Sequence, residues 1–279
     1  MIETMKRILE DAKEKHYAIP FFNVIDLQMA LGVLEAAEKA DRSVLIGLPE
    51  RFVDRIPIPA FAGMIRPLAE AASILVGIHF DHGNTEENCR IALNEGFTSV
   101  MLDRSAAPYE QNVEDLSRMC EYAHMFGASV EGELGIVTGK EGDVGDEHTG
   151  IEIGSSTDPA LAAEYVKRTG VDALAIAAGT AHGLYKAAPR IQFDCISACS
   201  SATDAALVLH GGTGVPDEDI RKAIRCGITK INVFTELNIA AACRIRDILS
   251  VKKGISDALL PERDGVRIQA ERVFSVFSI

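Results

Sequence analysis

The sequence predicts an α/β protein, a single-domain (β/α)8 barrel (TIM barrel) that spans residues 1–279. Eight apolar runs alternate with amphipathic helical patterns, and such alternation is typical of a parallel sheet covered by helices. The length is close to the roughly 250 residues of this barrel. A doubly wound open sheet is the alternative, but no Gly-x-Gly-x-x-Gly pattern opens a helix after the first strand, so its dinucleotide-binding form lacks support.

The expected elements interleave along the whole chain. The strands are expected at 17–22, 43–48, 74–80, 97–102, 128–134, 172–178, 205–210 and 228–233. The helices are expected at 26–41, 59–72, 85–95, 109–126, 158–169, 189–202, 216–226 and 235–250. Capping residues such as Thr85 and Asp158 precede two of these helices, and Gly127 and Gly170 follow two others. The glycine-rich stretch 135–156 is the longest irregular segment and suits a mobile lid over an active site.

The composition narrows the classes of partner. The net charge is −13 and no long basic run occurs, which argues against nucleic acid and anionic membranes. No apolar stretch of about 18 residues suggests a membrane span, and the N-terminus does not resemble a secretory signal. The six cysteines form no Cys-x-x-Cys pair; Cys195 and Cys199 would share one helix face. Free thiols in a reducing cytoplasm are the simplest interpretation, with a metal-binding pair as the alternative.

Three histidines follow three separate strand-like runs and carry the chemical prediction. His82 comes after Asp81, His182 precedes Gly183, and His210 precedes two glycines. Because strand ends of a barrel meet at one rim, we expect the three imidazoles to converge. Three neutral imidazoles leave a fourth position open on a zinc ion, as in catalytic sites. A single buried histidine is more often a core residue, which is the interpretation we give His79, with support of the site as its alternative.

Neighbouring residues predict an acid–base group and a phosphate site. Asp81 either orients a metal ligand or transfers a proton beside the metal. The segments that begin at His210 and Asn232 follow the last two strands and offer backbone N–H groups, the second at a helix start. Barrel phosphate sites often use these two loops. A phosphorylated substrate is therefore expected.

At these residues the chain resembles the class II, metal-dependent ketose-bisphosphate aldolases, and within them the tagatose-bisphosphate branch more than the longer fructose-bisphosphate branch. The similarity covers roughly residues 5–250 in the family's order and spacing. It runs through the segments 21–23, 81–83, 101–105, 131–135, 179–183, 210–214 and 230–235.

The resemblance implies a lyase of carbohydrate metabolism. One zinc ion on His82, His182 and His210 would polarise the ketose carbonyl and stabilise the enediolate of dihydroxyacetone phosphate, with an aldehyde as the other product. Asp81 would move the proton of the C4 hydroxyl, and Glu141 the proton at C1. The residues implied for the substrate and its phosphate are Asn23, Gly183, Gly211, Gly212, Thr213, Asn232, Val233, Phe234 and Thr235.

The resemblance also implies accessory ions and assembly. A monovalent cation, Na⁺ or K⁺, would lie beside the phosphate, and Asp103 and Glu133 could hold a second or displaced metal ion. Relatives are homodimers or homotetramers. Three histidines also suit cobalt or iron, so the sequence leaves the metal open.

Several positions depart from the family pattern, and we expect them on the aldehyde side of the substrate. Leu48 stands where a hydroxyl residue is usual, Glu50 replaces a small residue, and Phe234 is bulkier than its counterparts. Further departures are Asp26 and Gln28. We expect Leu48, Glu50, Arg51 and Phe234 to decide which aldehyde is used. The alternative to a usual ketose bisphosphate is therefore a different phosphorylated ketose with an altered aldehyde half, cleaved by the same chemistry.

Other functions stay open at this point. A Schiff-base aldolase would need a central lysine, for which Lys230 is the candidate. A zinc hydrolase barrel usually begins with His-x-His after the first strand, and that pattern is absent. A metal-bound barrel without catalytic activity is the non-enzyme alternative.

Overall fold

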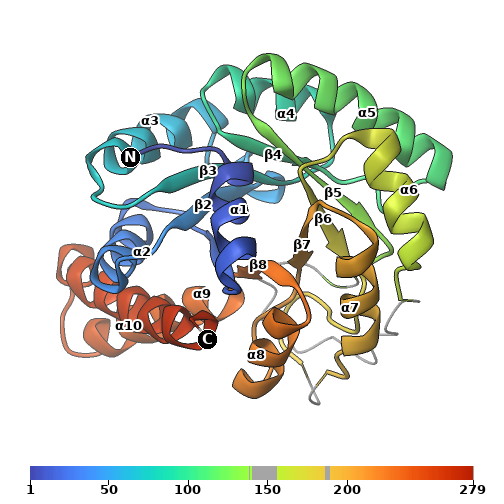
Figure 1. Cartoon of the computed structure of the whole chain (residues 1–279). Helices are drawn as coiled ribbons and strands as arrows, with labels where there is room; N and C mark the ends of the chain where they lie inside the picture. Colours follow the sequence, from blue (N-terminus) through green and yellow to red (C-terminus); the bar gives the residue numbers. More distant parts are fainter. Residues whose placement is uncertain (138, 140–155, 186–188, 279) are drawn as a thin grey trace.

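The computed structural model describes residues 1–137, 139, 156–185 and 189–278. Within this part, eight parallel strands close into a barrel in chain order, with β1 paired to β8 (Figure 1). The strands are β1 (Ile19–Asn23), β2 (Val44–Pro49), β3 (Val76–Gly83), β4 (Ser99–Leu102), β5 (Ser129–Leu134), β6 (Ala173–Ile176), β7 (Ala206–Leu209) and β8 (Ile228–Val233). The predicted barrel is confirmed, and closure between β1 and β8 excludes the open sheet.

Helices follow the strands and form the outer layer. They are α2 (Leu27–Ala40), α3 (Ile58–Ala71), α4 (Glu86–Asn94), α5 (Tyr109–Met125), α6 (Pro159–Thr169), α7 (Phe193–Ala202), α8 (Asp217–Arg225) and α9 (Thr235–Leu249). All six residues of β2 and of β8 are buried, since one face points into the barrel and the other meets helices. This burial on both faces explains the continuous apolar runs of the sequence.

Two long helices were not predicted from the sequence. Helix α1 (Met5–Lys15) buries Met5, Ile8, Leu9 and Ala12, the one-face spacing of an amphipathic helix. These side chains pack in one cluster with residues of β1, β2, β6 and β7, so α1 closes the end of the barrel where the strands begin (Figure 1). The site must therefore open at the opposite end.

Helix α10 (Leu259–Phe277) packs against α2 and α9 and brings the end of the chain back to its beginning. Two short 3-10 turns complete the described elements, η1 (Glu50–Phe52) and η2 (Ile255–Asp257). Among the described helices, none is both long enough and apolar enough to cross a membrane.

Candidate metal and active site

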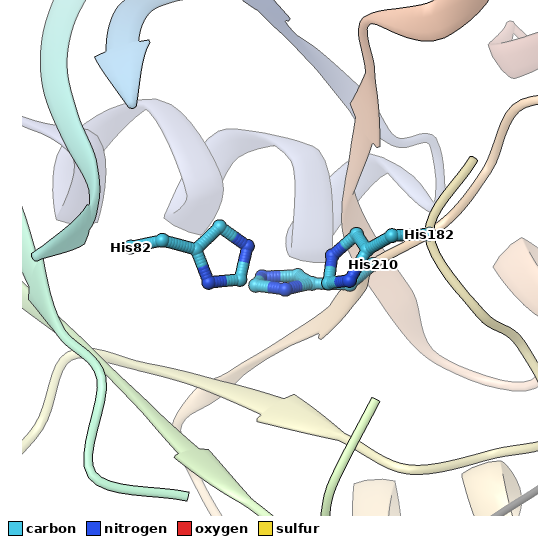
Figure 2. A group of neighbouring side chains, drawn as sticks. All are labelled: His82, His182 and His210. Atoms are coloured by element: carbon cyan, nitrogen blue, oxygen red, sulfur yellow. The ribbon is translucent and has the colours of Figure 1, made fainter. Parts of the chain in front are cut away.

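The three predicted histidines converge at the carboxyl end of the barrel. His82 lies in β3, His182 in the loop after β6, and His210 directly after β7. Figure 2 shows the three rings pointing toward one another, with ring centroids 4.8 to 5.4 Å apart. One ring nitrogen from each lies within 4.8 Å of the other two. Three imidazoles on one zinc ion have nitrogens roughly 3.3 Å apart, so small side-chain adjustments suffice for the fit.

The backbone at His82 explains how two neighbouring residues both serve the site. In a regular strand, Asp81 and His82 would point to opposite faces. His82 has φ of 46°, in the left-handed region that non-glycine residues rarely adopt, and the pairing of β3 with β4 shifts register between Phe80 and Gly83. The alternation is broken there, so Asp81 stays inside the barrel while the imidazole of His82 reaches the rim. Backbone strain of this kind is typical of functional sites.

Carboxylates orient two of the three imidazoles. Asp103 Oδ2 lies 3.2 Å from His82 Nδ1, which leaves Nε2 as the nitrogen for a metal. Glu131 Oε1 lies 2.9 Å from His210 Nε2, and Glu133 Oε2 lies 3.2 Å from His210 Nδ1. Partners of this kind fix the ring orientation and raise the basicity of a ligating histidine. Asp103 and Glu133, the two predicted alternative metal ligands, thus each contact one of the histidines.

The charges around these rings suit a cation. Burial, together with the other two imidazoles, lowers the pKa of His182 well below its usual value, so this ring is a neutral donor. Burial also acts to lower the pKa of His210, but Glu131 and Glu133 outweigh it and raise that pKa to about 9. A bound metal ion would replace the proton of His210 as the countercharge of these carboxylates.

Asp81 is fully buried beside the three histidines and is held by two amides. Asn23 Nδ2 donates to its Oδ2 at 2.8 Å, and Asn232 Nδ2 donates to its Oδ1 at 3.4 Å. Burial acts to raise the pKa of Asp81, but the charges of His82 and Lys230 outweigh it and hold the pKa at about 2. The carboxylate is therefore ionised near neutral pH, the form that can accept a proton.

A buried ion pair lies beneath the site inside the barrel. Lys230 Nζ lies 2.8 Å from Glu131 Oε2 and donates to Asn232 Oδ1 at 2.7 Å, and Lys230 and Glu131 are fully buried. These contacts engage the lysine with charged and polar partners and argue against its use as a Schiff-base nucleophile. His79 contacts Ser99 Oγ at 2.8 Å, and burial, then Lys230, lowers its pKa to about 4. His79 is thus a neutral core residue whose Nε2 lies 3.9 Å from Asp81 and 3.8 Å from Glu131.

The loops after β6, β7 and β8 contact one another where the phosphate site is expected. Tyr185 accepts a hydrogen bond from the N–H of Ala181 at 2.7 Å and donates to the carbonyl of Gly211 at 2.9 Å. Gly211 has φ of 69°, and a Cβ there would lie 2.2 Å from the carbonyl oxygen of Ala181. Gly212 donates to the carbonyl of Asn232 at 3.2 Å. Only glycine at position 211 permits this close approach of two loops.

The side chains of the predicted phosphate residues are mostly turned away from solvent. Thr213 and Thr235 are buried, and Val233 and Phe234 belong to the apolar core between strands and helices. Helix α9 begins at Thr235, so backbone N–H groups at its start are the donors that a phosphate could use. Gly183, in the loop that carries His182, also has a positive φ, of 88°.

A cavity of about 350 Å³ opens in front of the metal site. It is lined by Pro49, Arg51, His82, Asn84, Asp103, Val137, Gly139 and His182. This volume lies in the range of small-molecule sites. Its wall combines two candidate metal ligands with one cation, Arg51, so it is the place where a substrate can meet the metal.

Of the four residues expected to decide the aldehyde, only Arg51 lines the cavity. Leu48 is fully buried in the core outside the barrel, and the ring of Phe234 packs edge-on against Phe52 at 5.8 Å. The Glu50 carboxylate is bound just before α4: it accepts hydrogen bonds from the N–H groups of Asn84 and Thr85, the N-cap residue of that helix. The side chains of Leu48, Glu50 and Phe234 thus pack behind the cavity wall and do not line the cavity.

The predicted and the described site residues differ at three positions. Glu141 lies outside the described residues. Sequence reasoning missed Tyr185 and the ion-pairing role of Lys230. The tyrosine has no motif around it, but a lysine inside the predicted buried strand 228–233, two residues before Asn232, was a detectable signal of a buried charge partner.

Comparisons with known proteins agree with this geometry. The family described as "Fructose-bisphosphate aldolase class-II" matches residues 3–278. Proteins named fructose-bisphosphate aldolase from Staphylococcus epidermidis RP62A and Staphylococcus aureus Mu50 are 40% and 41% identical over 272 residues, which is 95% of this chain and 93% of each relative. The crystal structure of the YdjI aldolase from Escherichia coli K12 has a TM-score of 0.89 and 34% identity, with 99% of this chain and 97% of that chain covered.

Proposed function

The chain belongs to the class II fructose-bisphosphate aldolase family, and from this premise we propose that its three histidines hold one zinc ion and that Asp81 performs the proton transfer. Members of the family cleave a ketose bisphosphate into dihydroxyacetone phosphate and an aldehyde. The observation that carries the proposal is the convergence of three imidazoles beside one fully buried, amide-held carboxylate.

The residues fit the ion in number, geometry and charge. His82, His182 and His210 provide three nitrogen donors and leave room for substrate oxygen on the cavity side. A zinc ion there would supply Lewis-acid polarisation of the ketose carbonyl. Asp103 and Glu131 would keep two of the rings in the ligating orientation.

Asp81 is the proposed proton acceptor for the C4 hydroxyl when the C3–C4 bond breaks. Asn23 and Asn232 each hold one of its oxygens, so the carboxylate keeps one orientation throughout the reaction. In the direction of synthesis, the same group returns the proton. The proton at C1 is assigned to Glu141 on the resemblance alone.

The phosphate of the dihydroxyacetone phosphate half is proposed to bind the loops after β6, β7 and β8. The positions implied for the phosphate are Gly183, Gly211, Gly212, Thr213 and the segment from Asn232 to Thr235. Because the N–H of Gly212 already donates to the carbonyl of Asn232, the proposed donors are the N–H groups of Gly183, Gly211, Thr213 and Thr235. The start of α9 adds the favourable field of a helix N-terminus. A monovalent cation, Na⁺ or K⁺, beside this phosphate is part of the same proposal.

Arg51 is the proposed contact for the aldehyde half. Its guanidinium lies 4.9 Å from the centre of the Phe52 ring, and the preceding residue, Glu50, is fixed to α4. A cation held in this way at the cavity wall favours an aldehyde that carries a phosphate or carboxylate. Arg51→Ala should raise KM at least tenfold for such substrates while kcat with uncharged aldehydes stays the same. Equal effects on both substrate groups would remove Arg51 from substrate selection.

The decisive experiment is a retro-aldol screen of ketose phosphates with metal analysis of the same sample. We expect dihydroxyacetone phosphate from at least one ketose phosphate, one zinc ion per chain, and loss of activity with a chelator. Ordinary kcat/KM on fructose or tagatose bisphosphate would overturn the altered aldehyde preference but not the reaction. Activity that survives chelation and is trapped by borohydride would instead support a Schiff base on Lys230.

The setting of the enzyme completes the proposal. We propose one catalytic domain over residues 1–279, a homodimer or homotetramer, and a cytoplasmic location, each supported by the resemblance to the family. Light scattering on the purified protein tests the assembly: a monomer at micromolar concentration would contradict it.

A further inference from the structure

Two cysteines of α7 lie against the point where the glycine-rich segment rejoins the barrel. Cys195 and Cys199 are one helical turn apart, and both thiols donate to one acceptor, the carbonyl oxygen of Thr157, at 3.3 and 3.9 Å. Cys195 is partly exposed and Cys199 is buried. Nothing in the proposed reaction uses either thiol.

Thr157 ties together three parts of the barrel. Its hydroxyl donates to the carbonyl of Leu134 at 2.6 Å, at the end of β5, and accepts the N–H of Ala177 at 2.9 Å, just after β6. Its own N–H donates to the carbonyl of Ala177 at 3.0 Å. Gly135, with φ of 87°, lies so close that a Cβ there would be 3.0 Å from the Thr157 hydroxyl. Both ends of segment 135–157 are thus held at one residue.

The start of α7 is bound to the same place. Gln192 donates its N–H to the carbonyl of Ala178 at 2.9 Å, and its side chain accepts a hydrogen bond from the Ser156 hydroxyl. Ala177 and Ala178 lead directly into the loop that carries His182. A change at the thiols can therefore reach both the glycine-rich segment and a metal ligand through a few hydrogen bonds and a short stretch of backbone.

We propose that Cys195 and Cys199 form an oxidisable dithiol whose conversion to a disulfide loosens the Thr157 anchor and lowers aldolase activity. A hydroperoxide is the oxidant. The Cys195 thiolate attacks the O–O bond and becomes a sulfenic acid, with release of water; the Cys199 thiol then attacks that sulfur, forms the S–S bond and releases a second water. The two thiols lose two electrons, which reduce one hydrogen peroxide to two waters.

The local chemistry supports this order of events. When the Cys199 S–H turns from the Thr157 carbonyl to the Cys195 sulfur, its hydrogen bond lowers the pKa of Cys195 to about 7, although burial opposes the effect. A thiolate near neutral pH that is partly exposed is the reactive form. Cys199 is the neighbouring resolving thiol.

The bond requires movement of the helix, and that movement couples oxidation to the site. Residues four apart on a helix have Cβ atoms about 5–6 Å apart, whereas a disulfide needs about 3.5–4.5 Å. Cys195 lies in the first turn of α7, which has no side-chain cap, so the bond requires this turn to open and to give up the hydrogen bond from the Ile196 N–H to the Gln192 carbonyl. Thr157 then loses both S–H donors. The expected five- to tenfold fall in kcat corresponds to about 1–1.4 kcal/mol in the activation free energy.

The test uses the metal-loaded full chain, treated with hydrogen peroxide and followed by intact mass, peptide mapping and aldolase activity. We expect a loss of two mass units that maps to Cys195 and Cys199, a five- to tenfold fall in kcat, and recovery of both with dithiothreitol. Cys195→Ser and Cys199→Ser should keep basal activity, because a serine hydroxyl can still donate to Thr157, and should each abolish the disulfide and the inhibition.

Cys243→Ser is the matched control, since Cys243 is also partly exposed but lies on α9. This variant should respond to peroxide as the unmodified chain does. A disulfide that forms without any change in kcat would overturn the coupling to the site. Inhibition that persists in Cys195→Ser, or oxidation that maps to other cysteines, would overturn the dithiol itself. The mass readout does not depend on the substrate, so it separates this inference from the proposed function.

Discussion

Asp81 shows how single residues acquire their chemistry from neighbours far away in the sequence. Its carboxylate is buried, yet it remains ionised because His82 and Lys230 offset the cost of burial and because Asn23 and Asn232 donate to its oxygens. The Lys230 charge is balanced in turn by Glu131, which also orients His210. The proposed base and the metal ligands thus belong to one connected network, in which each buried charge has a partner.

Replacement of Asp81 by Asn separates the proton chemistry from metal binding. We expect kcat to fall by about 10²–10⁴, the usual contribution of a general acid–base residue, while the zinc content stays at one ion per chain. Steady-state kinetics and elemental analysis of the same preparation measure the two quantities. His182→Ala is the contrasting variant and should lose the metal. If Asp81→Asn kept its turnover, the proton-transfer assignment would be wrong.

At the scale of elements, the structure shows what one departure from the family pattern, Glu50, does behind the cavity wall. The turn η1 follows β2 and would be a loose connection without an anchor. The Glu50 carboxylate accepts hydrogen bonds from the backbone of Asn84 and Thr85, the hydroxyl of Thr85 and the amide of Asn88, all at the start of α4. A negative charge at this position also interacts favourably with the helix dipole. Glu50 therefore joins β2 to α4 and fixes Arg51 between them.

Glu50→Ala should lower the free energy of unfolding by about 2–3 kcal/mol, since several hydrogen bonds to one charged group are lost together. KM for anionic aldehydes should rise as well, because Arg51 loses its fixed position. Urea unfolding and steady-state kinetics check the two effects. Glu87→Ala, a change at an exposed acid in the first turn of α4, should stay within about 0.5 kcal/mol. Equal losses in both variants would indicate a general charge effect rather than a specific anchor.

At the scale of the whole molecule, the barrel was predictable because its signal is repeated eight times. Each strand is buried on both faces and each helix on one face. The alternation of strands and helices can therefore be recognised even when the predicted ends of the elements are wrong by one or two residues. The convergence of the histidines followed from that architecture. The pairing of Lys230 with Glu131 and the contacts of Glu50 with the start of α4 could not be predicted, since both join residues that are distant in sequence and depend on register. Helices α1 and α10 were not predicted, because they lie outside the strand–helix alternation.

The packing of α10 against the start of α2 makes the stability of the fold depend on pH. Asp26 caps α2 through the N–H of Met29 and hydrogen-bonds the Glu262 carboxyl of α10, 236 residues further along the chain. Burial, followed by the hydrogen bond and charge of Asp26, raises the pKa of Glu262 from 4.5 to about 8. The folded chain therefore holds a proton here that the unfolded chain releases above pH 4.5. This contribution to stability is complete below pH 4.5 and is lost as the pH rises through 8.

We therefore expect the free energy of unfolding of the metal-loaded protein to fall between pH 5 and 8 more steeply than in Glu262→Gln, by up to about 1.4 kcal/mol per pH unit for one proton. The neutral amide can still donate to Asp26 but cannot titrate, so the variant should keep the low-pH stability at high pH. Denaturant unfolding at several pH values gives both slopes. Metal loading keeps the protonation of His210 from contributing to the comparison. Parallel pH profiles for the two proteins would show that Asp26 and Glu262 do not share a proton in the folded chain.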